Sequence, residues 1–248
     1  YGQSYTVSTV AGASRLVDGR QATEVGLRYP WGVAQDAAGN LYITDRGDHR
    51  IFRVAATGVI TAIALGGLMT VQFAVASSGA LRQWERRPPP MFLLVGSMVA
   101  LVWLLSRSKL GSAVAKEASL TLLVGAQAFR LPLELTMHRA SSEGVMPVQM
   151  SFSGYNFDIL TGASALLLGI LLARGKAGTT AVRIWNAVGF LLLLNIVTIA
   201  VASLPMFHAF GEDHVNDWVT YPPFVWLPGV LVPAALLGHL LIWRKLRS

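Results

Sequence analysis

The feature that most constrains the fold is a series of long apolar segments that begins near residue 58. Six segments approach the ~18–20 mostly apolar residues that an α-helix needs to cross a bilayer. They are residues 59–81, 90–106, 118–137, 157–173, 184–204 and 222–243. Of the 248 residues, 53% are hydrophobic and only 13% are charged, so a soluble protein of this size could not cover them all in its core. We expect a mainly α, polytopic membrane helix bundle of about six spans.

Residues 1–58 follow a different pattern, that of short strands joined by tight turns. Apolar residues recur with strand spacing over 30–34, 41–45 and 51–54, and Gly, Asp and Asn separate these segments. This pattern predicts a small N-terminal antiparallel β-meander in residues 1–58, followed by the bundle in residues 59–248. Residues 58–64 could form either the last strand of the meander or the first turns of the first span.

The strand-forming segment contains the runs YPWGVA (29–34), AGNLYI (38–43) and GDHRI (47–51). Together these runs resemble the NHL repeat, the blade unit of a family of β-propellers, over about residues 7–64. The resemblance covers one blade, with Asp48, His49 and Arg50 at the place of the tripeptide that names the family. It implies a four-stranded sheet, but the partner binding of the family's multi-blade propellers does not carry over to one blade. Two interpretations of residues 1–58 are open: a module that binds a protein partner, or a fusion remnant or piece of a longer propeller. Because a single blade leaves two strand edges unpaired, it favours pairing with other chains.

The net charge of +7 is concentrated in the second part of the chain. Residues 1–57 are nearly balanced, and most other Lys and Arg lie between apolar segments, which suits an anionic membrane face better than a nucleic acid. The loop after the fourth span and the chain after the sixth are basic, whereas the 206–221 loop carries acids and no Lys or Arg. We therefore expect the basic loops to be cytoplasmic and the 206–221 loop to be external, where it could dock a protein.

Polar residues within the third predicted span are the best candidates for a functional site. Gln127, Arg130, Glu134 and His138 follow helical spacing, and Pro132 introduces a kink among them. Charges at this depth should face the bundle interior and pair. Two interpretations are open: an Arg130–Glu134 ion pair that fixes helix packing, or a site for a ligand or a proton.

Further polar residues are expected beside these four. Asn195 and His239 lie within the fifth and sixth spans and complete the predicted substrate-binding set. We expect Asp158 to cap the fourth span, Asn186 to be interfacial, and the apolar linker 140–157 to lie at the interface or re-enter the bundle. No catalytic residue and no metal ligand set is predicted, and the cofactor is unknown, since no motif supports a haem between His138 and His239.

Four runs in the apolar part, FRLPLE (129–134), GVMPVQM (144–150), NFDI (156–159) and PFVWLP (223–228), resemble a family of uncharacterised bacterial multi-pass membrane proteins. The resemblance covers about residues 65–248. It implies a multi-pass protein of a bacterial inner membrane and no particular activity.

The leading functional expectation is a small-molecule or proton-coupled transporter, in which Arg130 holds an anionic group and Glu134 exchanges protons. One alternative is a non-catalytic membrane scaffold or sensor that docks a partner through residues 1–58 or 206–221. Another is a membrane enzyme acting on lipid or quinone. Because no phosphate-binding loop, nucleophile elbow or metal helix is present, a protein without enzymatic activity is favoured.

Overall fold

The computed structural model of the protein describes residues 6–11, 20–21, 27–36, 40–46, 50–54 and 57–247. The chain is mainly helical, with a small antiparallel sheet near the N-terminus, as predicted. It divides into two compact units, residues 1–70 and 71–248, and the division falls within helix α1 (Thr57–Ser77).

The sheet has the strand order β2-β1-β5-β4-β3. Strands β3 (Pro30–Gln35), β4 (Leu41–Asp45) and β5 (Arg50–Val54) form the predicted antiparallel meander. Strand β1 (Thr6–Ala11) pairs with β5 on the other side, with Val7 opposite Val54, and β2 (Arg20–Gln21) pairs with β1. A strand that precedes the meander thus takes the place beside β5, and residues 58–64 belong to α1 instead.

Asp45, at the end of β4, holds the chain that enters β3. Its carboxylate accepts hydrogen bonds from the backbone N–H groups of Arg28 (2.6 Å) and Tyr29 (3.0 Å), and the side chain is buried. These bonds satisfy two backbone donors at the entry to β3, and the Tyr29 carbonyl accepts a hydrogen bond from the N–H of Arg46 at 3.0 Å.

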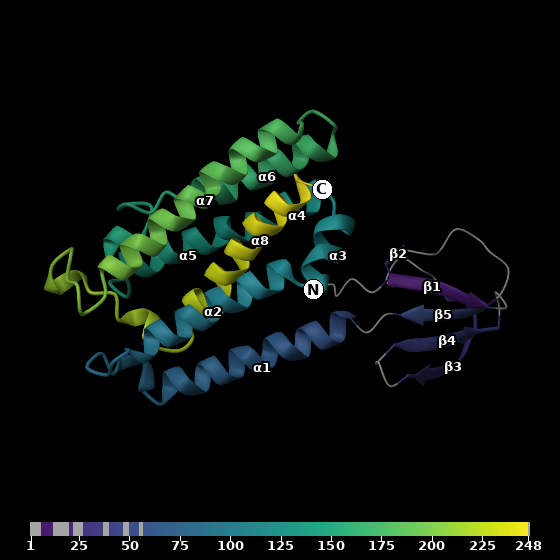
Figure 1. The fold of residues 1–248 in the computed structure, drawn as a ribbon, viewed down its shortest axis with the longest axis horizontal. Coiled ribbons are helices and arrows are strands. Elements are labelled where there is room, and N and C mark those ends of the chain that lie inside the picture. The colour runs from purple at the N-terminus through teal and green to yellow at the C-terminus, as the bar shows by residue number, and fades with distance from the viewer. Residues whose placement is uncertain are drawn as a thin grey trace. The chain divides into compact units, whose positions relative to one another are not determined.

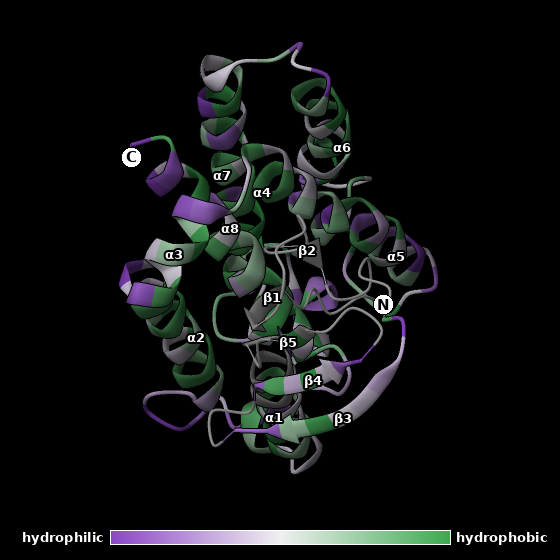
Figure 2. Cartoon of the chain, turned by 90° about the vertical axis from the view of Figure 1, so that its right-hand side faces the viewer, coloured by the Kyte–Doolittle hydropathy of each residue, from purple (hydrophilic) through white to green (hydrophobic). Residues whose placement is uncertain are grey.

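Helix α1 is followed by seven further α-helices in the part of the chain that the structure describes (Figure 1). They are α2 (Pro90–Arg107), α3 (Lys109–Glu117), α4 (Leu120–Ala126), α5 (Arg130–Ser142), α6 (Ile159–Ala173), α7 (Thr179–Ala202) and α8 (Val232–Lys245). Hydrophobic residues extend along α2, α6 and α7, and hydrophilic residues gather near their ends (Figure 2).

The expectation of about six membrane-spanning helices is wrong, because fewer single helices are long and apolar enough to cross a membrane. Three helical segments among the described residues are long and apolar enough to cross a membrane: α2, α7, and the continuous segment Leu227–Lys245. The third predicted span is divided into α4, a 3-10 turn at Gln127–Phe129 and α5, and the fourth, α6, has only 15 residues. The apolar part of α1 within the searched residues, Leu65–Ser77, is also short.

The segments predicted as linkers carry more structure than expected. Residues 109–117 form α3, because the hydroxyl of Ser108 accepts a hydrogen bond from the N–H of Gly111 and caps a new helix. The 140–157 linker contains a 3-10 turn at Val148–Met150, and Met146 and Met150 are buried in the core. This linker is packed into the bundle, as its apolar composition suggests.

A proline in the last helical segment frees a backbone carbonyl within the bundle. Pro233 has no N–H, so the carbonyl of Gly229, four residues earlier, lacks its usual α-helical donor. The segment Leu227–Leu231 is a π-helix, and the Gly229 carbonyl accepts a hydrogen bond from Nε2 of Gln72 in α1 at 3.0 Å. A Cβ at position 229 would lie 2.7 Å from Cδ of Gln72, so glycine permits this contact.

Candidate functional site

The break between α4 and α5 positions the central residue of the site. Pro132 leaves the carbonyl of Ala128 without an α-helical partner, and residues Gln127–Phe129 form a 3-10 turn. Helix α5 starts immediately afterwards at Arg130, whose side chain is 1% exposed. A buried guanidinium of this kind must be paired, because the desolvation of an unpaired charge is too costly.

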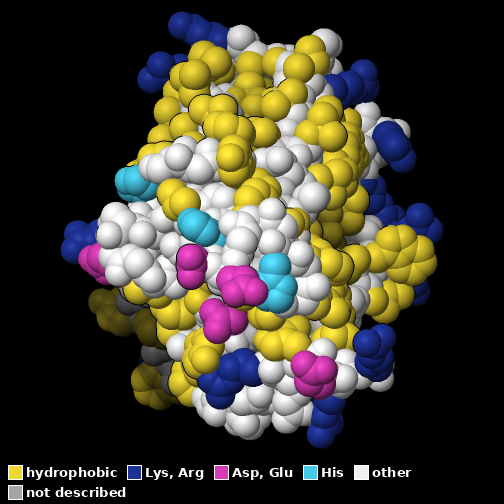
Figure 3. Space-filling view, turned by 90° about the vertical axis from the view of Figure 1, so that its left-hand side faces the viewer, with side chains coloured by type: hydrophobic (Ala, Val, Ile, Leu, Met, Phe, Trp, Pro, Cys, Tyr) yellow, Lys and Arg dark blue, Asp and Glu magenta, His cyan; other side chains and the backbone are white. Residues whose placement is uncertain are grey.

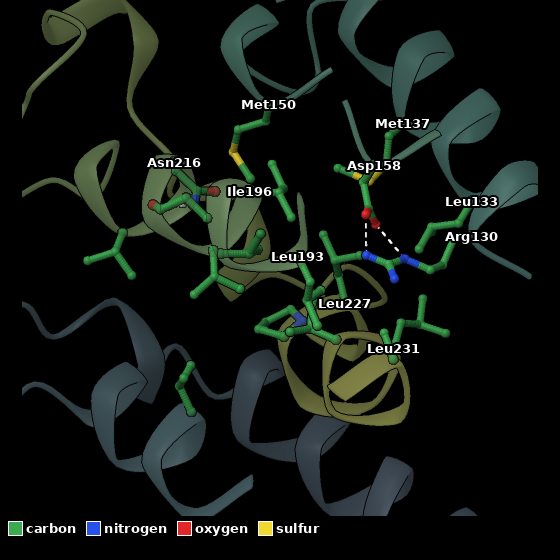
Figure 4. Close-up of a pocket in the computed structure, with 18 of the residues that line it drawn as sticks. Arg130, Leu133, Met137, Met150, Asp158, Leu193, Ile196, Asn216, Leu227 and Leu231 are labelled. Atoms are coloured by element: carbon green, nitrogen blue, oxygen red, sulfur yellow. Dashed lines mark hydrogen bonds and ion pairs between the residues drawn. The ribbon is translucent and has the colours of Figure 1, made fainter. Parts of the chain in front are cut away.

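The ion-pair partner of Arg130 is Asp158. Nε of Arg130 donates to Oδ2 of Asp158 at 2.6 Å, and Nη2 donates to Oδ1, which gives the bidentate geometry that arginine and carboxylates favour (Figure 4). The expected Arg130–Glu134 ion pair is wrong, and the expected cap at Asp158 is right in position only. Asp158 does occupy the N-cap position of α6 but makes no side-chain cap bond, since its carboxylate is directed to Arg130.

A close approach of α5 and α6 makes this pair possible. At Gly162, one turn into α6, a Cβ would lie 2.9 Å from the carbonyl carbon of Arg130 and from Cα of Leu131. Any side chain at this position would push the two backbones apart. The glycine therefore permits the spacing at which Asp158 reaches Arg130.

His239 of α8 approaches Arg130 from another side. Nη1 of Arg130 lies 2.8 Å from Nε2 of His239, and Nδ1 of His239 lies 2.8 Å from Oδ1 of Asn186 in α7. Because arginine is only a donor, Nε2 must be the acceptor, and Nδ1 therefore carries the proton that it donates to Asn186. The Asn186 amide is oriented by its own bond from Nδ2 to the His239 carbonyl at 3.2 Å.

Glu134 belongs to the same buried group through Asn156. Oε2 of Glu134 accepts a hydrogen bond from Nδ2 of Asn156 at 2.7 Å, and Oδ1 of Asn156 accepts one from the backbone N–H of Asp158 at 3.0 Å. Asn156 thus links the Glu134 carboxylate to the backbone of Asp158. Glu134 is 2% exposed and Asn156 is fully buried.

Arg130, Glu134 and Asp158 border a cavity of about 120 Å³ within the bundle. Its wall is mostly apolar and comes from α2, α5, α7, the Leu227–Lys245 segment and the loops beside them. Arg130, Glu134 and Asp158 supply its charged part, and Asn216 lies across the cavity from the ion pair (Figure 4). The apolar lining includes Leu133, Met137, Met150, Leu193, Ile196, Leu227 and Leu231.

The structure brings part of the predicted set together. Arg130 and Glu134 border the cavity, and His239 contacts Arg130. Gln127 is buried beside them, and its Nε2 donates to the Ala235 carbonyl at 3.4 Å.

His138 and Asn195 lie away from this group. His138 stacks on Phe152 with ring centroids 4.2 Å apart, and its Nδ1 lies 3.1 Å from the Ser153 hydroxyl. Each four-residue step advances the helical face by about 40°, so two steps carry His138 well away from the direction of Arg130. Leu193 of α7 lines the cavity, and Asn195, two residues later, lies on nearly the opposite face of the helix. Asn195 donates instead to the Tyr155 carbonyl.

Three asparagines of the site were missed or misplaced by the sequence interpretation. Asn186 is fully buried instead of interfacial, because α7 begins at Thr179, five residues before the predicted span. Asn156 and Asn216 lie in predicted linkers, where polar residues are common and do not by themselves indicate a site. For Asn156 the one sequence signal is its position within the unusually apolar 140–157 linker, whereas Asn216, in the acidic 206–221 loop, has no such signal.

The residues that the structure describes contain no cluster of three or more His, Cys, Asp or Glu side chains suited to a metal ion. Both ring nitrogens of His239 are used in contacts with Arg130 and Asn186. The buried group is therefore a hydrogen-bonded network of side chains with one charged pair at its centre.

Comparison with known proteins identifies only the N-terminal segment. The NHL repeat matches residues 27–54, which cover β3, β4 and β5. No curated protein and no solved structure gives a significant match to the chain. The resemblance of residues 65–248 to bacterial multi-pass membrane proteins has no support from a family match.

Proposed function

We propose that the helical part of the chain is a membrane-embedded carrier that binds a small molecule in the cavity beside Arg130 and Glu134. The cavity carries the proposal, because it combines an apolar wall with a buried charged pair and a second carboxylate, between helices long enough to span a bilayer. Intramembrane ionisable groups are expensive and are characteristic of transport paths and ligand sites.

The outer surface of the bundle supports its location in a membrane. Large apolar side chains project outward along the helices, each at least 60% exposed: Leu122, Leu160, Leu167, Ile184 and Leu191. In water this surface would be an extensive apolar patch, whereas lipid tails solvate it without cost.

The two ends of the bundle differ in charge in the way the positive-inside tendency requires. One end carries nine basic residues and one acid: Arg107, Lys109, Lys116, Arg174, Lys176, Arg183, Arg244, Lys245 and Arg247, with Glu117. The other end carries Arg82, Arg86, Arg87 and Arg139, together with Glu85, Glu143, Glu212, Asp213 and Asp217. Figure 3 shows acidic and histidine side chains gathered on this second end. We assign the first end to the cytoplasm; the bacterial inner membrane stays a prediction from the sequence.

Within the site, Arg130 takes a different role from the one first expected, whereas Glu134 keeps its expected role. Arg130 is held by Asp158, so it organises the wall and does not serve as a free anchor for an anion. Glu134 has Asn156 as its neutral partner and borders the cavity, which makes it the group that takes up and releases a proton during transport.

A counterflow experiment tests this proposal even when the substrate is unidentified. Vesicles containing the purified protein are loaded with an unlabelled small-molecule cell extract and placed in the same extract labelled with ¹⁴C. Vesicles that contain the carrier should accumulate label faster than protein-free vesicles loaded in the same way. The rate of accumulation should depend on pH, and Glu134→Gln should abolish this dependence. Glu143→Gln is the matched control, because Glu143 is exposed at the end of α5. Uptake equal to that of empty vesicles would contradict the proposal.

A second candidate function is protein docking by the N-terminal sheet. Tyr29, Trp31 and Val33, at alternate positions on or beside the edge strand β3, are 72%, 80% and 66% exposed. Exposed apolar side chains on a strand at the edge of the described sheet favour association with another chain. Docking predicts a complex with a partner protein that is lost in Trp31→Ser. The complex should be retained in Trp103→Ser, which alters a tryptophan of α2, and in Glu134→Gln, which alters the cavity. Retention of the complex in Trp31→Ser would exclude this face.

A further inference from the structure

The proposed binding cavity has polar groups at two separate places, and these restrict the chemistry of its ligand. The charged group of Arg130, Glu134 and Asp158 lies on one side, and Asn216 lies on the other, with Leu193 and Ile196 between them (Figure 4). The rest of the wall is almost entirely apolar. A ligand must therefore be mostly apolar, with polar atoms that match these two places.

The charged side disfavours an anion. Arg130 is the cation in this wall, and three of its five N–H groups already donate to Asp158 and His239. Two carboxylates accompany this one guanidinium, so an anionic ligand would meet no uncompensated positive charge. Desolvation of the anion would then have no compensating interaction.

The opposite side offers a hydrogen-bond acceptor that lacks a donor. Asn216 is 1% exposed, and its Nδ2 donates to the Ala200 carbonyl at 2.9 Å, which fixes the orientation of the amide. Its Oδ1 has no hydrogen-bond partner among the described residues. A buried acceptor left in this state is costly, so a ligand that supplies an O–H or N–H donor gains what the protein alone lacks.

The cavity volume limits the size of the enclosed part of the ligand. At about 120 Å³ it is close to the ~150 Å³ of an engineered apolar cavity that binds benzene. A single six-membered ring with one small substituent, or the corresponding part of a larger molecule, is therefore the appropriate scale.

We infer that the cavity selects a neutral, mostly apolar molecule of about this size that bears a hydroxyl group, and that the hydroxyl donates its hydrogen bond to Oδ1 of Asn216. The inference rests on the proposed function only in requiring that the cavity admits a ligand. A free alcohol or phenol and the hydroxyl of a membrane lipid share this chemistry.

Phenol and toluene form a matched pair of probes, because they have the same shape and differ in O–H against CH₃. The experiment measures the binding of radiolabelled phenol, toluene and benzoate to the purified protein in lipid nanodiscs. The signal from protein-free nanodiscs is subtracted, because it reports partition into the lipid alone. We expect phenol to bind about tenfold more tightly than toluene, the effect of one hydrogen bond to a buried acceptor, and benzoate to bind least. Asn216→Leu should remove the preference, whereas Asn195→Leu, which alters an asparagine away from the cavity, should retain it.

Equal affinities of the wild-type protein for phenol and toluene would overturn the inference, and this comparison needs no variant to fold. An unchanged preference in Asn216→Leu would overturn it as well. Binding that appears only after lipid extraction would identify a lipid hydroxyl as the occupant and support the same chemistry. Phenol binding without exchange in the counterflow experiment would refute transport and leave the ligand assignment standing.

Discussion

Arg130 and Asp158, 28 residues apart in the chain, form a bidentate ion pair in which the side chains are only 1% and 6% exposed. The pair joins the start of α5 to the start of α6 and borders the cavity. Its burial makes it important for specificity of packing, because either charge alone would be unpaired in a low-dielectric interior.

Replacing Asp158 by Asn should destabilise the protein by about 3–5 kcal/mol, because the buried Arg130 would lose the carboxylate that pairs with it directly. The change in the free energy of unfolding can be measured by denaturant titration in detergent micelles. The double variant Arg130→Met with Asp158→Leu should recover much of the loss, since it removes both charges. A double variant less stable than Asp158→Asn would contradict this account.

The exposed Arg139–Glu143 pair of α5 is the matched control for this experiment. Its side chains are 78% and 53% exposed, and Nε of Arg139 donates to Oε1 of Glu143 at 2.6 Å. Because solvent screens such a pair, Glu143→Gln should change the unfolding free energy by less than ~1 kcal/mol.

Gly162→Ala should separate α5 from α6 and loosen the ion pair. The added Cβ would lie 2.9 Å from backbone atoms of Arg130 and Leu131, and overpacking of this kind costs about 1–3 kcal/mol. Gly169→Ala on the same helix is the control, because its nearest atom, Cα of Gly125, is 3.5 Å away. Comparable thermal stability of the two variants would show that the close approach at Gly162 is not needed.

The His239 ring should be found in the tautomer that carries its proton on Nδ1. Arg130 donates to Nε2, and Asn186 accepts from Nδ1, so each ring nitrogen has an assigned role. NMR of the protein labelled with ¹⁵N-histidine distinguishes the two tautomers directly. Asn186→Leu should disturb the His239 signals and leave those of His138 unchanged; a proton on Nε2 in the wild-type protein would refute the network.

The charge difference between the bundle ends predicts opposite sides of the membrane for two introduced cysteines. The chain has no cysteine, so single variants such as Lys176→Cys and Asp213→Cys can be labelled without background. In intact cells a membrane-impermeant maleimide should modify Asp213→Cys and spare Lys176→Cys. Both variants should react after the cells are lysed. If both or neither were labelled in intact cells, the assigned orientation would be contradicted.

Asp45→Ala should weaken the N-terminal sheet without affecting the bundle. The carboxylate of Asp45 accepts from the N–H groups of Arg28 and Tyr29, and its removal would leave both without that acceptor at a cost of about 1–3 kcal/mol. Amide hydrogen exchange should accelerate in β3, β4 and β5 and stay unchanged in α7. Unaltered exchange in the strands would show that these bonds contribute little.

The sequence predicted the location of the site better than its connections. Arg130, Glu134 and His239 were identified because charged and polar residues are rare in apolar segments. The partner of Arg130 was misidentified because helical spacing along one segment favours Glu134, four residues away. Asp158, which precedes α6, enters the pair only because Gly162 lets two helix backbones approach closely.

The count of membrane-spanning helices failed for a related reason. Apolar composition identified every segment correctly as hydrophobic, but a continuous apolar stretch need not be one helix. Pro132 and the 3-10 turn at Gln127–Phe129 divide the third segment, and α6 is 15 residues long. Helix ends depend on caps and on tertiary packing, which composition does not report.

By itself the sequence determined the two parts of this chain: short strands before residue 58 and mostly apolar helical segments after it. Both depend on local composition and periodicity, which a single segment carries in full. The tertiary structure alone decided that β1 lies beside β5, that Arg130 pairs with Asp158 and contacts His239, and that Asn216 faces them across a cavity. These relationships join residues that are distant in the chain. They depend on how helices and strands pack against one another, and the periodicity of a single segment does not report that packing.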